Sequence, residues 1–268
     1  DPVEFMAALM TSVIDNPGKV AEYIYSCRQM GIKILPPDIN HGYSSFSVDN
    51  GSIRYGLAAI KSIGRPVIKE IVAERKANGE FKNLKDFIER MSGKDINKRT
   101  IENFIKSGAF DELGGTRKQF MVIYVQILDQ VNREKKNSMT GQMSLFDIVG
   151  EEQKSEFDIP LPNVGEYEKS TKLAFEKEVL GIYLSGHPME EYEEQWRKGI
   201  SKTTQDFQFD EELGFSRVSD GAAEIIGGII ASKTIKYTKN NKTMCFLTIE
   251  DIMGSVEVVV FPRDCLLY

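Results

Sequence analysis

Residues 53–71 read I-R-Y-G-L-A-A-I-K-S-I-G-R-P-V-I-K-E-I, and this stretch decides the fold around it. Apolar side chains recur at helical spacing on both sides of a central turn. They are Leu57, Ile60 and Ile63 before the turn, and Val67, Ile68 and Ile71 after it. Gly64 permits a sharp change of direction, and Pro66 suits the first turn of the next helix. The stretch therefore predicts two short amphipathic helices joined by a tight turn.

Three cations, Lys61, Arg65 and Lys69, surround this turn. A helix N-terminus offers free N–H groups and the positive end of the helix dipole, so it suits a phosphate. The pattern predicts a helix-hairpin-helix element that holds nucleic-acid backbone without reading bases. Ser62 departs from it, because a glycine usually precedes the central apolar residue, and a purely structural helix pair is the alternative. The expected DNA-contacting residues are Lys61, Ser62, Ile63, Gly64, Arg65, Lys69, Lys98 and Arg99.

The charge of the chain is unevenly distributed. The net charge is −6 over 268 residues, yet residues 51–120 carry 15 basic and 9 acidic side chains. Residues 151–215 carry 7 basic and 16 acidic side chains. Because salt screens charges beyond about 8–10 Å, a locally basic module in an acidic chain can still bind phosphates. The alternative is that these lysines and arginines only solvate helix faces.

The composition also indicates the cellular compartment and the kind of chain. No run of about 18 apolar residues predicts a membrane span. Cys27, Cys245 and Cys265 form neither a disulfide framework nor a C-x-x-C site, which favours a reducing cytoplasm. The start at Asp1-Pro2, without methionine, indicates an excised fragment.

The remaining pattern predicts an α+β protein that is mostly α-helical. Helices are expected at residues 2–16, 17–30, 81–91, 98–107, 117–133 and 166–181, with 81–91 and 98–107 as a second hairpin unit. Asn50-Gly51 predicts a β-hairpin between strands at 46–48 and 53–55. Residues 134–165 are polar and read as a linker with one apolar island. Three strands expected within 223–235, 244–250 and 255–261 suggest the start of an OB-fold barrel, which the chain truncates.

Several segments resemble one known family in the same order along the chain. They are P-V-E-F-M-A-A-L at 2–9, L-P-P-D-I-N at 35–40, Y-G-L-A-A-I-K at 55–61, I-N-K-R at 96–99, S-G-A-F-D at 107–111, E-V-L-G-I-Y-L-S-G-H-P at 178–188 and L-T-I-E-D at 247–251. Together they resemble the C-terminal half of the alpha subunits of the bacterial replicative DNA polymerase III.

The resemblance implies a domain plan. Residues 1–50 would be the C-terminal part of the fingers region, and 51–133 a helix-hairpin-helix domain with a trailing helix. Residues 134–165 would be a flexible linker carrying a motif for the sliding clamp, 166–215 a helical connector, and 216–268 the N-terminal part of an OB-fold domain. The expected function is to hold DNA and tether the polymerase to the clamp for processive synthesis.

Further site residues follow from this resemblance. Gln142, Leu145 and Phe146 look like the Q-x-x-L-F clamp-binding motif, in which a peptide docks two apolar side chains. The alternative is that Leu145 and Phe146 fold back on a neighbouring domain. Residues expected near single-stranded template are Lys233, Lys236, Tyr237, Lys239 and Phe246, although Phe246 could instead belong to the barrel core. Candidates from the fingers region are Arg28, Asn40 and Ser44.

No catalytic or metal-binding residue is expected in this chain. The family's metal-holding carboxylates lie in a palm region with no counterpart here, so magnesium is implied only for the parent polymerase and the fragment should be inactive alone. Expected partners are double-stranded DNA, single-stranded template, the sliding clamp and other replicase subunits, with no membrane. Two other classes stay open: a repair or helicase accessory protein with helix-hairpin-helix and OB modules, and an interaction scaffold that uses its acidic segment.

Overall fold

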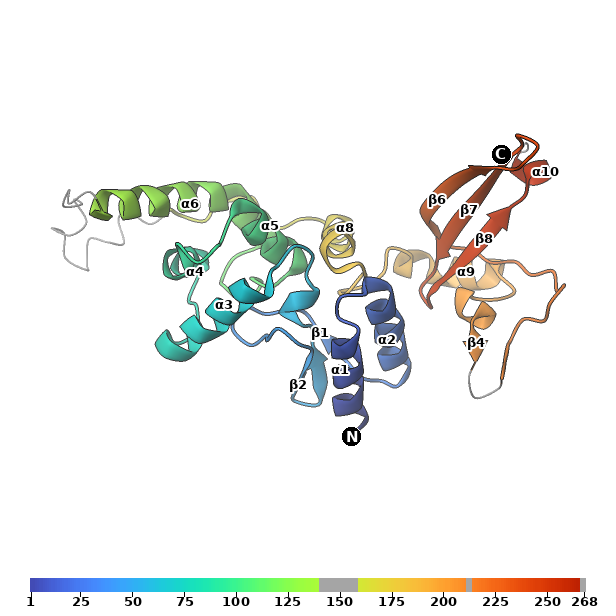
Figure 1. Cartoon of the computed structure of the whole chain (residues 1–268), viewed down its shortest axis with the longest axis horizontal. Coiled ribbons are helices and arrows are strands. Elements are labelled where there is room, and N and C mark those ends of the chain that lie inside the picture. Colours follow the sequence, from blue (N-terminus) through green and yellow to red (C-terminus); the bar gives the residue numbers. More distant parts are fainter. Residues whose placement is uncertain (140–158, 211–213, 266–268) are drawn as a thin grey trace. The chain divides into compact units, whose positions relative to one another are not determined.

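The computed structural model describes residues 1–139, 159–210 and 214–265 of the chain (Figure 1). The chain divides into two compact units, residues 1–185 and residues 186–268, called here the first and the second unit. No helix in the described ranges is long and apolar enough to cross a membrane. The α+β class and the predominance of helix expected from the sequence are confirmed.

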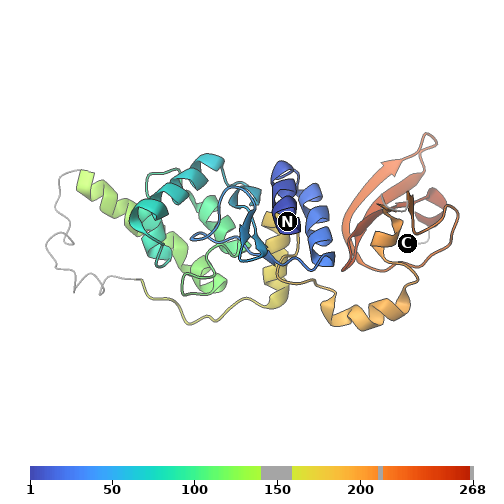
Figure 2. The same cartoon turned by 90° about the horizontal axis from the view of Figure 1, so that it is seen from below.

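The first unit surrounds a small three-stranded sheet with helices. Helices α1 and α2 lie side by side in both views (Figures 1 and 2). The elements are α1 (Pro2–Ser12), α2 (Pro17–Gln29), β1 (Ile34–Leu35), β2 (Ser47–Asp49), β3 (Ser52–Arg54), the 3-10 helix η1 (Leu57–Ala59), α3 (Arg65–Asn78), α4 (Leu84–Met91), α5 (Lys98–Ser107), α6 (Arg117–Met139) and α8 (Lys169–Leu180).

Local sequence signals set many of these boundaries. The side chain of Asn16 accepts the Lys19 N–H at 3.2 Å and starts α2. Asn97 caps α5, which ends at Gly108 in the left-handed conformation, as the sequence predicts. Asn50 and Gly51 have φ of 50° and 78°, which suits the tight turn of the β2–β3 hairpin. Helix α6 runs six residues beyond the predicted end at 133.

The first helix predicted within residues 53–71 is wrong. Residues 52–54 form strand β3, which pairs in parallel with β1 and antiparallel with β2. Only the 3-10 turn η1 follows, because the Leu57 and Ala58 N–H groups donate to the carbonyls of Tyr43 and Ser44. These distant acceptors replace the local ones that an α-helix would use. The second predicted helix is present as α3, with Pro66 in its first turn.

Helix α8, which follows the undescribed segment 140–158, packs on α5. The buried Tyr55 hydroxyl donates to the Leu180 carbonyl at 3.1 Å, and burial raises the pKa of this phenol above its usual value. The ring of Tyr55 meets that of Phe46 edge to face, 4.9 Å apart. Such a phenol pairs its buried polar tip while its ring fills the core. Tyr55 therefore ties the sheet to the end of α8.

A buried ionic network fixes the same helix. Arg117 donates to the carboxylates of Asp111 at 2.8 Å and Glu176 at 3.2 Å, and its side chain is 4% exposed. The other oxygen of Glu176 accepts the N–H groups of Leu184 and Ser185. A buried charge is tolerated when it is paired and hydrogen-bonded in this way. The network joins the start of α6, the middle of α8 and the segment that leaves α8.

The second unit is built on the antiparallel sheet β6-β7-β8, which Figure 2 shows as one twisted layer. The predicted first strand begins late, because Ile225 and Gly227 bond instead to Ser201 and Trp196. In the described ranges the sheet is not closed into a barrel, and the OB assignment stays a prediction. The elements are η3 (Glu190–Tyr192), α9 (Glu193–Gly199), η4 (Thr204–Phe207), β4 (Phe209–Asp210), β5 (Phe215–Ser216), β6 (Ile229–Tyr237), β7 (Thr243–Glu250), β8 (Ser255–Val260) and α10 (Pro262–Cys265). The connector expected at 166–215 contributes to both units.

Candidate nucleic-acid interface

The hairpin loop lies between η1 and α3 and owes its shape to Ser62. Ser62 has φ of +63°, the left-handed region that a glycine normally occupies. Gly64 has φ of −74° and an extended conformation, so the turn does not use the freedom that the sequence assigns to this glycine. Ile60 and Ile63 are buried below the loop as expected. Serine therefore adopts the conformation for which the usual motif carries glycine.

Two helices hold the backbone of Lys61 in place. The Lys61 N–H donates to the Val179 carbonyl on α8 at 2.8 Å. The Lys61 carbonyl accepts from the Asn103 side-chain amide on α5 at 2.6 Å. Asn103 is buried on the face of α5 that also carries Ile101, Phe104 and Ile105, and a buried amide needs such a partner. Sequence reasoning missed both residues, although an asparagine at a core position of α5 was a usable signal.

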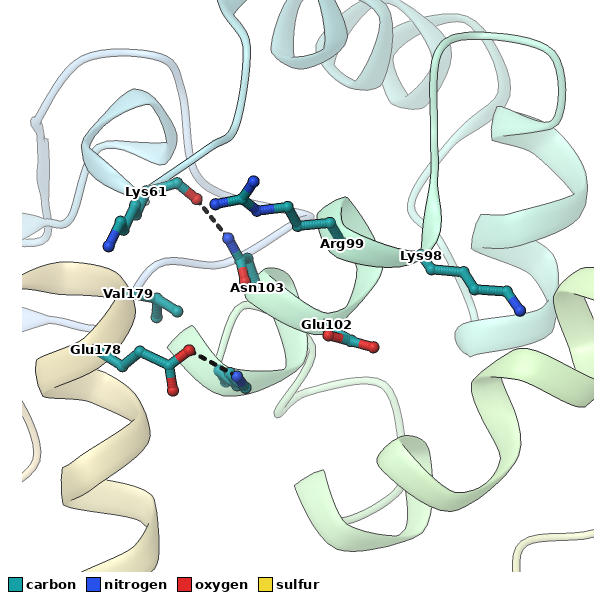
Figure 3. A pocket seen from close by; sticks show the side chains of 8 residues that line it. Lys61, Lys98, Arg99, Glu102, Asn103, Glu178 and Val179 are labelled. Atoms are coloured by element: carbon teal, nitrogen blue, oxygen red, sulfur yellow. Dashed lines mark hydrogen bonds and ion pairs between the residues drawn. The ribbon is translucent and has the colours of Figure 1, made fainter.

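Three of the predicted DNA-contacting side chains line one pocket of about 410 Å³ in the first unit. They are Lys61 from the loop and Lys98 and Arg99 from the first turn of α5. Figure 3 shows Arg99 extending toward Lys61, beside Asn103, whereas Lys98 points the other way. The other residues lining the pocket are Glu102, Asn103, Lys106, Glu178 and Val179.

The charges of this pocket are only partly neutralised. Lys106 pairs with Glu178 on α8 at 2.8 Å. Among the residues that the structure describes, Lys61, Lys98 and Arg99 are exposed and have no ion pair. The two basic residues of α5 also stand at the positive end of the helix dipole. The pocket therefore has unpaired positive charges, from Lys61, Lys98 and Arg99, that can bind an anion.

The start of α3 adds a second anion-binding feature. Gly64 supplies no side-chain cap, so the N-terminal N–H groups of α3 are not covered by a side chain. Arg65 pairs with Asp15 at 3.0 Å, but their side chains are 58% and 84% exposed. Exposed pairs of this kind contribute about 0–1 kcal/mol and exchange readily for other partners. The start of α3 and the pocket at α5 are therefore two candidate anion-binding features of the first unit.

Acidic residues of α3 are neutralised on a different face. Glu74 accepts hydrogen bonds from Lys94, Asn78 and Arg90, which together lower its pKa to about 2. Glu70 also lies within 3.8 Å of the Lys94 ammonium. Lys94 contributes to the positive charge of residues 51–120 in the sequence. In the structure its ammonium pairs with α3, so it joins α3 to the segment after α4.

The residues predicted to approach single strands lie on the second unit. The Lys236 ammonium lies 4.6 Å from the centre of the Phe246 ring, which is half-buried. Tyr237 is 71% exposed at the end of β6. Lys233 and Lys239 are also exposed, on β6 and on the turn that follows it. The structure brings Lys236 and Phe246 together as a cation–aromatic pair.

The candidates from the predicted fingers region have internal partners. Arg28 donates to the carbonyls of Tyr183 and Leu184 at 2.9 and 3.3 Å. The Asn40 amide donates to the Phe81 carbonyl at 2.9 Å and accepts the Phe81 N–H at 2.8 Å. The Ser44 carbonyl accepts from Ala58. These contacts give Arg28 and Asn40 evident structural roles.

Two further expectations concern the clamp-binding motif and metal binding. Gln142, Leu145 and Phe146 lie outside the described residues. Within those residues, no group of three His, Cys, Asp or Glu side chains could hold a metal ion.

Comparison with known proteins finds one matching family model and several similar proteins. A family model described as "Helix-hairpin-helix motif" matches residues 31–120, which include the loop, α3 and α5. The chain is 36% identical to the DNA polymerase III subunit alpha of Borreliella burgdorferi and 35% identical to that of Vibrio cholerae, in each case over 98% of this chain and 22% of the relative. It is 36% identical to that of Thermus aquaticus, over 98% of this chain and 20% of the relative. The chain spans about a fifth of the length of these curated relatives and is homologous to one segment of the DNA polymerase III alpha subunits.

Replacement of Ser62 by glycine tests the origin of the loop's shape. Ser62→Gly removes the strain of a left-handed serine, which exceeds the added entropy cost of glycine, and should stabilise the first unit by up to about 1 kcal/mol. Gly64→Ala is the matched control, because its φ suits alanine and a Cβ there meets only Pro66 Cδ at 3.6 Å. Urea unfolding measures both variants. A loss of stability in Ser62→Gly would contradict the assignment.

Proposed function

We propose that this chain binds the backbone of duplex DNA as part of a DNA polymerase III alpha subunit. The observation that carries the proposal is the loop backbone at Lys61, which α5 and α8 hold so that Lys61 and Arg99 line one pocket. The uncapped start of α3 follows the loop directly in the sequence. A site whose cations are already positioned loses less conformational entropy when a phosphate binds.

The chemistry of the proposed site suits backbone rather than bases. Lysine and arginine side chains and helix N-termini contact phosphates, and such contacts position a protein on DNA without reading sequence. Binding should therefore be strongly salt-dependent and nearly independent of sequence. Both properties suit a protein that must hold any duplex leaving a polymerase.

Homology favours the polymerase over the alternatives. A helix-hairpin-helix accessory protein would share the motif at 31–120, whereas the similarity to the alpha subunits extends over almost the whole chain. An interaction scaffold would not need unpaired cations gathered in one pocket. We accordingly propose that the parent protein is a DNA-directed DNA polymerase and that this segment has no activity alone.

Removal of two cations that line the pocket, Lys61 and Arg99, tests duplex binding. Lys61→Ala/Arg99→Ala should weaken binding roughly tenfold or more and reduce the slope of log K against log salt by about 2, because two phosphate contacts are lost. Fluorescence anisotropy with a labelled duplex at several salt concentrations measures both quantities. Lys33→Ala/Lys82→Ala, which removes two other exposed lysines of the first unit, is the control. Equal effects of the two double variants would reject a specific site at the hairpin.

We further propose that the segment after α6 tethers the chain to a sliding clamp through Gln142, Leu145 and Phe146. The support is the motif itself, whose Leu145 and Phe146 lie in the apolar island of an otherwise polar stretch that follows the proposed DNA-binding module. Single-stranded template near Lys236 and Phe246, and other replicase subunits, complete the proposed set of partners.

Clamp binding has a direct assay. The chain should bind a bacterial sliding clamp in calorimetry, and Leu145→Ala/Phe146→Ala should abolish the binding because it removes both apolar anchors. The double variant should bind duplex DNA like the unaltered chain. No binding of the unaltered chain at tens of micromolar would refute the tether and leave the proposed duplex site intact.

A further inference from the structure

A row of cations follows one exposed face of α3. Arg65, Lys69 and Lys76 stand at positions i, i+4 and i+11, which fall on one side of a helix, and Ala73 lies between the last two. All four residues are exposed. Since an α-helix rises 1.5 Å per residue, the row is about 16 Å long. It begins at the hairpin loop and leads away from it; we call it the α3 stripe.

The other faces of α3 pack in the core or carry glutamates that pair with residues outside α3. These glutamates therefore do not neutralise the α3 stripe. Val67, Ile68 and Ile71 are buried in the core. Glu70 and Glu74 pair with Lys94, and Glu74 also pairs with Arg90. Within the described residues, Lys69 and Lys76 have no ion pair. The charges of Lys69 and Lys76 are therefore available to a ligand, whereas Arg65 is paired with Asp15 at the surface.

An aromatic side chain lies at the far end of the stripe. The Tyr43 ring is 4.8 Å from the guanidinium carbon of Arg75 and 5.9 Å from the Lys76 ammonium, and Tyr43 remains 44% exposed. Aromatic side chains beside cations are the elements with which proteins stack unpaired bases.

The support beneath Tyr43 is rigid. Its carbonyl accepts the Leu57 N–H at 2.8 Å, which ties it to the base of the hairpin. A Cβ on the preceding Gly42 would lie 2.6 Å from the Asp38 carbonyl oxygen, so the backbone packs too closely for a side chain there. Arg75 is buried and donates to the Ile39 carbonyl at 2.8 Å. The ring is thus held from two elements.

We propose that the α3 stripe and Tyr43 bind a single nucleic-acid strand that continues beyond the duplex at the hairpin, with an unpaired base stacked on Tyr43. The proposal rests on the duplex binding proposed above and adds a second, single-stranded ligand to the first unit. For a strand that stays stacked as in B-DNA, with an axial rise of about 3.4 Å per nucleotide, the stripe matches about five nucleotides. Phosphates meet Lys69 and Lys76, and stacking supplies affinity that does not depend on base identity.

The test compares a blunt duplex with the same duplex carrying a single-stranded extension of about five nucleotides, in each polarity. The full chain should bind one extended form more tightly. Tyr43→Ala should lose between about fivefold and a hundredfold of affinity for that form and keep its affinity for the blunt duplex, because only stacking is removed. Tyr43→Phe retains the ring and should keep the preference, and Lys76→Ala should reduce it.

Other outcomes would overturn the proposal. A chain that binds blunt and extended duplexes equally, or a Tyr43→Ala variant that keeps the preference, overturns the proposal while the duplex site stands. If Tyr43→Ala unfolds at a much lower temperature, an unchanged preference in Lys76→Ala overturns it instead. Absence of any DNA binding by the unaltered chain overturns this proposal together with the proposed function.

Discussion

The candidate interface depends on two hydrogen bonds to the backbone of one residue, Lys61. The N–H of Lys61 is held by Val179 and its carbonyl by Asn103, from helices that lie far apart in the sequence. An exposed loop of this length would otherwise sample several conformations, each costing entropy to restrict. Here α5 and α8 restrict it before any ligand arrives. The position of Lys61 relative to Arg99 is a consequence of this restraint.

The restraint on the loop depends on buried contacts of the first unit. Helix α8 presents Val179 to the loop because Tyr55 and Arg117 fix its end and its middle. Glu176 completes the arrangement by accepting from the chain that leaves α8. Buried polar networks of this kind are stabilising only when every member is satisfied. The surface chemistry of the hairpin is therefore coupled to α8, which lies beyond the matched motif at 31–120.

The sequence predicts correctly those features that interactions between neighbouring residues determine. The helix starts expected at residues 17 and 98, the Asn50-Gly51 turn and the buried face of α3 are confirmed, since neighbouring residues determine each of them. The helix expected before the hairpin is wrong because pairing with β1 and β2 outweighs the helical pattern of residues 53–60. The roles of Asn103 and Val179 arise only from tertiary packing, so no spacing rule could place them at the loop. Ser62 was recognised as a departure from the motif, and its left-handed backbone explains how the turn forms nonetheless.

The central claim is that a preorganised hairpin loop, together with the start of α5, receives the DNA backbone. Hydrogen–deuterium exchange of the full chain, with and without a saturating blunt duplex, tests it most directly. In the free chain, the Lys61 amide should already exchange slowly because its N–H is bonded to Val179. On adding DNA, new protection should concentrate in residues 60–69 and 97–103. Rapid exchange at Lys61 in the free chain, or DNA-induced protection that spares both segments, would contradict the account.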